Sequence, residues 1–322
     1  MNVINKELFK NAKGGTAFDG VCLIKGYSKK QTKTGKDYIE GSLQSGSEIR
    51  FNAWSSSEAL NKLVAEDYVN MPCRVIGTFD EFKGNVSATL VDVVAVTGFV
   101  MADFLEARVD ADAYLDALKA LSFSRLSESG KTLLSKMLFD NTDLVNRFKV
   151  EFAAKTYHGN YLSGLLVHTF RMESVLSWIL STYSNLSSEY VDGKLVKSEK
   201  RVDLLYIGVV LHDIGKVQEL EYGVYTKSSA VTHRILGLDL LYQFRMDIEG
   251  LYDEKWFRDL QSIIVEHHGE YEESCRTVPA YIVHKIDMLE SAMEGLNSRV
   301  GEDVVVDTAG ERVLIETKFL AI

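Results

Sequence analysis

The sequence is short of proline and cysteine and has no long apolar run. Its two prolines, Pro72 and Pro279, exclude a proline-rich linker. Three cysteines with no CxxC pair fit reduced thiols better than a disulfide framework or a thiolate zinc site. The longest apolar run near the middle of the chain, residues 204–211, falls far short of the roughly 20 residues that span a bilayer. The N-terminus shows no apolar export signal, so we expect a cytoplasmic protein with no membrane partner.

The net charge of −10, taken alone, argues against a protein that coats nucleic acid. The charge is unevenly distributed, however. Residues 1–100 carry 12 basic and 11 acidic side chains, and eight lysines stand against only Glu7 and Asp19 in the first 36 residues. The acidity therefore belongs to the rest of the chain, and contact with nucleic acid is expected to begin near the N-terminus.

The pattern of apolar residues changes from strand-like to helical along the chain. Alternating or β-branched runs at 18–27, 37–44, 47–54, 73–79 and 85–96 predict five strands, with a short helix within 55–65. This is the order of an OB-fold, although other small barrels remain alternatives. Apolar steps of three and four residues then predict helices at 112–121, 127–138, 142–154, 163–183, 202–213, 228–244, 254–268 and 279–296.

The expected architecture is therefore an N-terminal all-β OB-fold barrel at residues 1–98, followed by an all-α helical bundle at residues 99–322. The polar stretch at 185–201 interrupts the helical pattern and is interpreted as a surface excursion. Weak alternation at 304–315 suggests a terminal hairpin.

Histidine is absent from the first 157 residues, and all seven histidines lie between His158 and His284. Any one of them is as easily explained by a hydrogen-bonded core or surface position. Gly215, shortly after one His-Asp pair, is placed to end a helix. Seven donors on five predicted helices are harder to explain singly: His168, His212, Asp213, His233, His267, His268 and Asp287. Such nitrogen and oxygen donors suit Mn, Fe, Co, Ni or Zn, and they suffice for two ions bridged by one carboxylate.

The order of these donors resembles that of HD-domain metal-dependent phosphohydrolases in their dinuclear form. A closer resemblance is to the YhaM-type 3′-to-5′ exoribonucleases, which place an OB-fold before the HD domain. It is carried by the segments 153–158, 163–169, 211–216, 225–226 and 283–287. This chain departs from the family at 163–168, where Ser163 and Val167 replace the first glycine and the glutamate of Gly-Gly-Leu-Leu-Glu-His.

The resemblance implies two divalent ions, with Mn first and Co, Fe, Ni or Zn as alternatives. It assigns His168, His212, Asp213 and Asp287 to one ion, with Asp213 bridging to a second ion held by His233, His267 and His268. A water activated by both ions would be the nucleophile. Lys216 is similar to a family lysine that contacts a phosphate oxygen, but a surface lysine explains it equally well. His158 is a candidate for protonating the leaving oxygen, with a structural hydrogen bond as the alternative.

The first predicted hairpin of the barrel combines lysines with aromatic residues, the combination by which OB-folds hold single strands. The candidate nucleic-acid-binding residues are Lys25, Lys29, Lys30, Lys33, Lys36, Tyr38 and Trp54. In the alternative interpretation, Phe51 and Trp54 fill the barrel core and the lysines are solvated.

The leading hypothesis is a metal-dependent 3′-to-5′ exonuclease acting on single-stranded RNA, with single-stranded DNA as a second substrate. One alternative is an HD phosphodiesterase for cyclic or short oligonucleotides. The other is a non-catalytic nucleic-acid-binding protein, of the replication-enhancer-binding type, whose metal site is structural. The sequence leaves the oligomeric state open, a homo-oligomer included.

Overall fold

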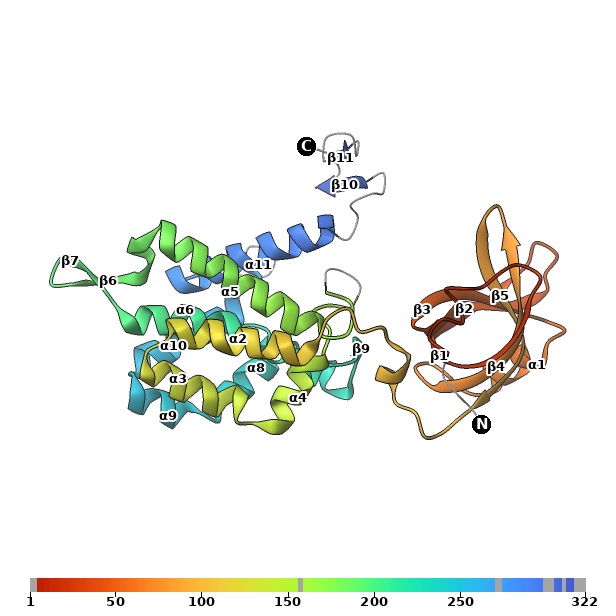
Figure 1. Cartoon of the computed structure of the whole chain (residues 1–322), viewed down its shortest axis with the longest axis horizontal. Coiled ribbons are helices and arrows are strands. Elements are labelled where there is room, and N and C mark those ends of the chain that lie inside the picture. Colours follow the sequence, from red (N-terminus) through yellow and green to blue (C-terminus); the bar gives the residue numbers. More distant parts are fainter. Residues whose placement is uncertain (1–4, 156–158, 270–273, 298–303, 309–310, 316–322) are drawn as a thin grey trace. The chain divides into compact units, whose positions relative to one another are not determined.

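The computed structural model describes residues 5–155, 159–269 and 274–297, together with the backbone of two paired terminal strands, β10 (Val304–Thr308) and β11 (Glu311–Ile315). The chain divides into two compact units, residues 1–108 and 109–322, here named the barrel unit and the helical unit (Figure 1). Among the described residues, no helix has both the length and the apolar character needed to cross a membrane.

The barrel unit is a closed five-stranded barrel with strand order β1-β2-β3-β5-β4. Its elements are β1 (Ala17–Gln31), β2 (Asp37–Ser45), β3 (Ser47–Trp54), α1 (Glu58–Ala65), β4 (Pro72–Phe82) and β5 (Asn85–Ala95). β1 pairs with β4 from Ala17 to Leu23 and with β2 from Leu23 to Gln31, with a register shift in the β2 pairing between Ile24 and Gly26. Among the paired strands that the structure describes, only β3 and β5, whose short pairing closes the barrel, run parallel. The predicted OB-like barrel followed by a helical bundle is confirmed.

Residues 99–108, assigned from the sequence to the second domain, are part of the barrel unit. They include a short 3₁₀ turn, η1 (Met101–Phe104), whose Phe104 is fully buried against Val21 and Leu23. The backbone N–H of Gly46 donates to the carbonyl of Phe104 at 2.8 Å. This apolar contact and hydrogen bond anchor the segment to the barrel.

The helical unit contains α2 (Ala111–Arg125), α3 (Glu128–Leu134) continuing into a π-helical turn (Ser135–Phe139), α4 (Thr142–Val150), α5 (Gly164–Thr182), α6 (Glu199–Leu211), α7 (Lys216–Glu219), α8 (His233–Tyr242), α9 (Arg245–Leu251), α10 (Glu254–Glu266) and α11 (Val278–Asn297). Two small hairpins interrupt the helices: β6 (Ser188–Val191) with β7 (Lys194–Lys197), and β8 (Leu220–Glu221) with β9 (Val224–Tyr225).

Two predictions about local structure were wrong in detail. The helix expected from residue 228 begins at His233, because Thr226 caps a separate 3₁₀ turn at Lys227–Ala230. The polar excursion at 185–201 contains the β6–β7 hairpin, and α6 starts within it at Glu199. The Ser198 hydroxyl caps this helix by accepting a hydrogen bond from the N–H of Arg201.

Helix α6 is the centre of the helical unit. Every residue from Asp203 to Leu211 is buried, so the helix has no polar face and is surrounded by its neighbours. Helices α2, α3, α5, α10 and α11 all pack against it. Because α6 ends inside the unit, the residues that follow it, His212 and Asp213, are delivered into the interior.

Candidate metal centre

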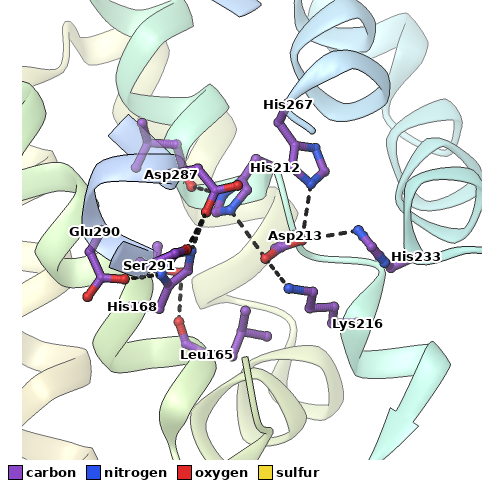
Figure 2. A network of polar contacts seen from close by, with 12 residues as sticks. Leu165, His168, His212, Asp213, Lys216, His233, His267, Asp287, Glu290 and Ser291 are labelled. Atoms are coloured by element: carbon purple, nitrogen blue, oxygen red, sulfur yellow. Dashed lines mark hydrogen bonds and ion pairs between the residues drawn. The ribbon is translucent and has the colours of Figure 1, made fainter. Parts of the chain in front are cut away.

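The predicted donor side chains converge from five places in the helical unit, and Figure 2 labels all of them except His268. They are His168 on α5, His212 and Asp213 directly after α6, His233 at the start of α8, His267 and His268 directly after α10, and Asp287 on α11. All but His268 and Asp287 are buried. The helical packing therefore assembles in one place residues that are up to 119 positions apart in the sequence.

The donor atoms form two overlapping groups that share Asp213. One group is His168, His212 and Asp213; the other is Asp213, His233, His267 and His268; within each, the donor atoms all lie within 4.8 Å of one another. Asp213 Oδ2 lies 3.3 Å from His212 Nε2, and Asp213 Oδ1 lies 3.4 Å from His233 Nε2 and from His267 Nε2. Asp287 Oδ1 lies 3.3 Å from His168 Nε2, which places it beside the first group.

Hydrogen bonds at the back of the rings decide which ring nitrogen faces the centre. His212 Nδ1 donates to the carbonyl of Val209 at 2.8 Å, and His267 Nδ1 donates to that of Ile264 at 2.9 Å. A carbonyl oxygen can only accept, so in the neutral ring Nδ1 carries the hydrogen and Nε2 carries a lone pair. These lone pairs point toward Asp213.

This arrangement fits a bound cation. Within the described residues, the Nε2 atoms of His212, His233 and His267, and Oδ1 of Asp213, are buried without a hydrogen bond. Buried polar atoms are normally paired, and a lone pair facing a carboxylate oxygen is repulsive unless a positive charge lies between them. Two ligands about 2.1 Å from one ion at a tetrahedral angle are about 3.4 Å apart, close to the separations seen here. The residues present can therefore hold a metal ion.

The electrostatics of the site agree with this fit. Burial alone would raise the pKa of Asp213, but the Lys216 ammonium, with Nζ 2.5 Å from Oδ2, and the neighbouring histidines hold it well below its usual value. Burial alone would also raise the pKa of Asp287, but its hydrogen bond with His168 and the charges of His168 and His212 together lower it. Burial lowers the pKa of His267 to about 4. At neutral pH the carboxylates are thus ionised and His267 is neutral, as metal binding requires.

His168 is the histidine that most favours a positive charge. Burial alone would lower its pKa, but hydrogen bonds and charge interactions with Asp287 and Glu290 raise it to about 9. A proton or a cation is therefore favoured at this ring, and a bound metal ion would take the place of the proton.

Gly215 lets the segment after α6 pack against α8, whereas the sequence predicted that this glycine ends a helix. Its φ of −64° is ordinary right-handed backbone, and α6 has already ended at Leu211, so Gly215 does not end the helix through a left-handed residue. A Cβ at this position would instead collide with the carbonyl oxygen of His233. The missing side chain thus lets the loop that carries Asp213 pack directly on the start of α8.

The turn after α10 is fixed by His284, a histidine outside the donor groups. Its buried ring donates from Nδ1 to the carbonyl of His267 at 2.7 Å. Gly269, at φ +60°, lies so close to the His284 ring that a Cβ would collide with it. His284 thereby orients the backbone that presents His267 and His268. His158, the candidate proton donor, lies outside the described residues.

Two carboxylates at the site were missed in the sequence. Glu290 accepts a hydrogen bond from His168 Nδ1, and Glu219 Oε2 accepts one from His233 Nδ1 at 3.0 Å. For Glu290 a signal was present, because it is one helical turn beyond Asp287 and so shares its face of α11. No local pattern singles out Glu219.

The candidate nucleic-acid-binding lysines of the barrel differ in their surroundings. Lys29 pairs with Asp37 at 2.6 Å and Lys30 pairs with Glu40 at 3.2 Å, which offsets their charge. Lys25 is partly buried, and burial lowers its pKa. Lys33 and Lys36 are exposed in the β1–β2 turn.

Of the barrel's aromatic residues, some lie in the core and others on the surface, the two positions that the sequence left open. Phe51 is fully buried in the barrel core, whereas Trp54 is 40% exposed and stacks on Tyr38 with ring centroids 5.0 Å apart. The core interpretation was therefore right for Phe51 and wrong for Trp54. A groove of about 620 Å³ opens on the barrel, lined among others by Arg50, Asn52 and Phe82. Asn52 and Trp54 alternate onto the same face of β3, so the groove and the stacked pair share that face.

Comparisons with known proteins confirm the predicted resemblance. Residues 165–292 match the family model of the HD domain. The chain is also similar to two curated relatives, both named 3′-5′ exoribonuclease YhaM. The one from Bacillus subtilis (strain 168) is 26% identical over 295 residues, covering 87% of this chain and 86% of the relative. The one from Oceanobacillus iheyensis is 23% identical over 303 residues, covering 88% and 86%.

A weaker match is to the solved structure of a Replication Protein A heterotrimer bound to ssDNA. It covers 30% of this chain and 81% of that chain, at 16% sequence identity and a TM-score of 0.23. A TM-score this low supports no argument about fold or function.

Proposed function

We propose that the chain is a metal-dependent 3′-to-5′ exonuclease that hydrolyses single-stranded RNA, with single-stranded DNA as a second substrate, and releases nucleoside 5′-monophosphates. The match to the HD domain and the similarity to the two exoribonucleases support a phosphohydrolase or nuclease. The observation that carries the proposal is the pair of donor groups that share Asp213 and are buried except for His268.

The two groups would hold two divalent ions, with Mn²⁺ as the first candidate. His168, His212, Asp213 and Asp287 would hold one ion, and Asp213, His233, His267 and His268 the other. When bound, such ions lower the pKa of a shared water and polarise the phosphodiester. The chain then needs no nucleophile of its own.

The protein's own residues would supply orientation and charge. The Nδ1 hydrogen bonds of His212 and His267 keep both rings aimed at the centre before substrate arrives. Lys216 is the one cationic side chain that a hydrogen bond ties to Asp213 among the described residues. From this position beside Asp213, the Lys216 ammonium would stabilise negative charge that develops on a phosphoryl oxygen.

The barrel would bind the strand. The exposed Trp54–Tyr38 stack offers a face for bases, and base stacking contributes about 1–3 kcal/mol per base without sequence preference. Lys33 and Lys36 in the adjacent turn would contact phosphates, as would Arg50 in the groove. Lys25, Lys29 and Lys30 would contribute less, since they are partly buried or already paired.

The test is a cleavage assay on 5′-labelled single-stranded RNA. Protein stripped of metal is supplied with Mn²⁺ and compared with Asp213→Ala and with a matched control, Asp239→Ala, which removes an exposed carboxylate on α8. We expect a ladder that shortens from the 3′ end in the wild type and the control and disappears in Asp213→Ala. Cleavage of cyclic or dinucleotide substrates alone would favour the oligonucleotide phosphodiesterase. If the protein binds RNA but cleaves no substrate with any divalent metal, the proposed enzymatic activity is refuted.

A further inference from the structure

Two of the candidate ligand histidines each donate a ring hydrogen bond to a carboxylate that is not itself a donor to the centre. The two histidines belong to different donor groups, here called the two halves of the centre. Glu290 accepts from His168 Nδ1, and Glu219 accepts from His233 Nδ1 at 3.0 Å. His168 belongs to the first donor group and His233 to the second. Neither glutamate is in either donor group.

The other two buried ligand histidines are held differently. His212 and His267 donate to the carbonyls of Val209 and Ile264, each three residues earlier, in the helix that the histidine directly follows. These acceptors are local, because any helix that ends in this way provides them. Each half of the centre thus has one histidine backed by a local carbonyl and one backed by a carboxylate from another element.

Glu290 is buried on α11 and pairs with an arginine of the neighbouring helix α5. It is 5% exposed, and its Oε1 lies 3.4 Å from the guanidinium of Arg171, which also pairs with Glu294 one turn further along the helix. Arg171 is on α5, one turn after His168. The guanidinium therefore balances the buried charge of Glu290 and ties α11 to the helix that carries His168.

Glu219 accepts two hydrogen bonds from His233. Its Oε2 accepts from the ring, and its Oε1 accepts from the backbone N–H of His233 at 3.2 Å. His233 is the first residue of α8, so this carboxylate also satisfies a backbone N–H at the start of that helix. Ring and backbone are thus fixed by the same side chain.

We propose that Glu219 and Glu290 are positioning residues, one for each half of the metal centre. Each fixes the tautomer and orientation of a single histidine, and so sets the metal affinity of its own half-site independently of the other. This inference rests on the proposed function only in so far as the centre binds two ions. Removing a carboxylate that supports a ligand histidine weakens metal binding about 10- to 100-fold.

The experiment measures metal binding directly rather than activity. Full-length protein stripped by a chelator is titrated with Mn²⁺, and free Mn²⁺ is followed by electron paramagnetic resonance. The variants are Glu219→Gln, Glu290→Gln and the double variant, with Glu294→Gln as a matched control that touches Arg171 but not a histidine. Thermal unfolding of the metal-free proteins checks that each variant remains folded.

We expect the wild type and Glu294→Gln to bind two ions with the same affinities, within about threefold. Each of the other single variants should bind one ion as tightly as the wild type and the second about 10- to 100-fold more weakly. The double variant should bind both ions weakly, each to the extent seen in the corresponding single variant.

Three results would contradict this expectation in different ways. If the wild type binds no Mn²⁺ or other divalent ion, the proposed function fails and the inference fails with it. If it binds two ions and the single variants bind both as tightly, only the inference is overturned. If a single variant weakens both ions equally, or the double variant weakens only one, the two half-sites are not set independently.

Discussion

Replacing Glu173 by glutamine should stabilise the helical unit by an amount that grows with pH. Glu173 on α5 is fully buried, and burial raises the pKa of its carboxyl to about 8, although a hydrogen bond with Ser122 opposes the shift. The Ser122 hydroxyl lies 2.8 and 2.9 Å from the two carboxylate oxygens and 2.9 Å from the carbonyl of Leu118. A protonated Glu173 can donate to Ser122 while Ser122 donates to Leu118. Glutamine can make the same donation through its amide.

The sign of the effect follows from which state binds the proton. At neutral pH the folded chain holds a proton on Glu173, and the unfolded chain, with a pKa near 4.5, does not. Unfolding therefore releases a proton, and this group's contribution to stability is fully present below pH 4.5 and is lost as pH rises toward 8. Glutamine does not titrate. The difference in unfolding free energy between Glu173→Gln and the wild type should rise by about 2.5 kcal/mol from pH 5 to pH 7.

The assay is urea unfolding at pH 5, 6, 7 and 8, followed by circular dichroism at 222 nm. This signal reports the helical unit, because the barrel unit contains one short α-helix among its described residues. Titration of the histidine cluster is common to both proteins and cancels in the difference. A control variant, Glu128→Gln, removes a carboxylate that is 90% exposed, and its difference from the wild type should not show this rise. A difference for Glu173→Gln that stays constant within about 0.5 kcal/mol would refute a protonated buried carboxyl.

Three further substitutions test other parts of the structure. Ser163 has a left-handed φ of +69°, which strains the backbone of any residue other than glycine. Ser163→Gly should therefore raise the free energy of unfolding by about 1 kcal/mol, and a lower stability in urea would contradict backbone strain at this position. Gly215→Ala should lower it by about 1–3 kcal/mol and weaken Mn²⁺ binding by displacing His233; unchanged unfolding and titration curves would show that the contact is not tight. Trp54→Ala should weaken single-stranded RNA binding by about 1–3 kcal/mol in a fluorescence anisotropy assay, with dinucleotide hydrolysis unchanged. Tyr190→Ala, which removes an exposed aromatic ring from β6, should bind as the wild type does; an equal loss in both variants would argue against a specific role for the barrel aromatic.

Most of the fold could be predicted because its signals are local. Alternating residues such as Ile39, Leu43 and Phe51 point into the barrel, and three- and four-residue spacing marks the helices. Prediction failed where an element depends on a partner elsewhere. Residues 99–108 join the barrel unit through Phe104, and nothing in their own sequence indicates that contact.

The candidate site shows the same division. The residue types His168, Asp213 and His267 indicated metal chemistry because imidazoles and carboxylates are the donors that such ions prefer. The exposure of Trp54 could not be predicted, since a tryptophan at the end of a strand packs equally well inside or outside a small barrel. The function of Gly215 was misjudged because its neighbour, the start of α8, is 18 residues away along the chain.

The sequence by itself determined the two fold classes and the chemistry of the donors, because periodicity and residue type are properties of short segments. The tertiary structure brought these donors together in two groups that share Asp213, the division that the resemblance implied, and only it decided that Glu219 and Glu290 support one histidine in each. The Glu290–His168 hydrogen bond joins residues 122 positions apart. Such a pairing depends on how α5 and α11 pack, and packing geometry is a property of the assembled helices rather than of either segment.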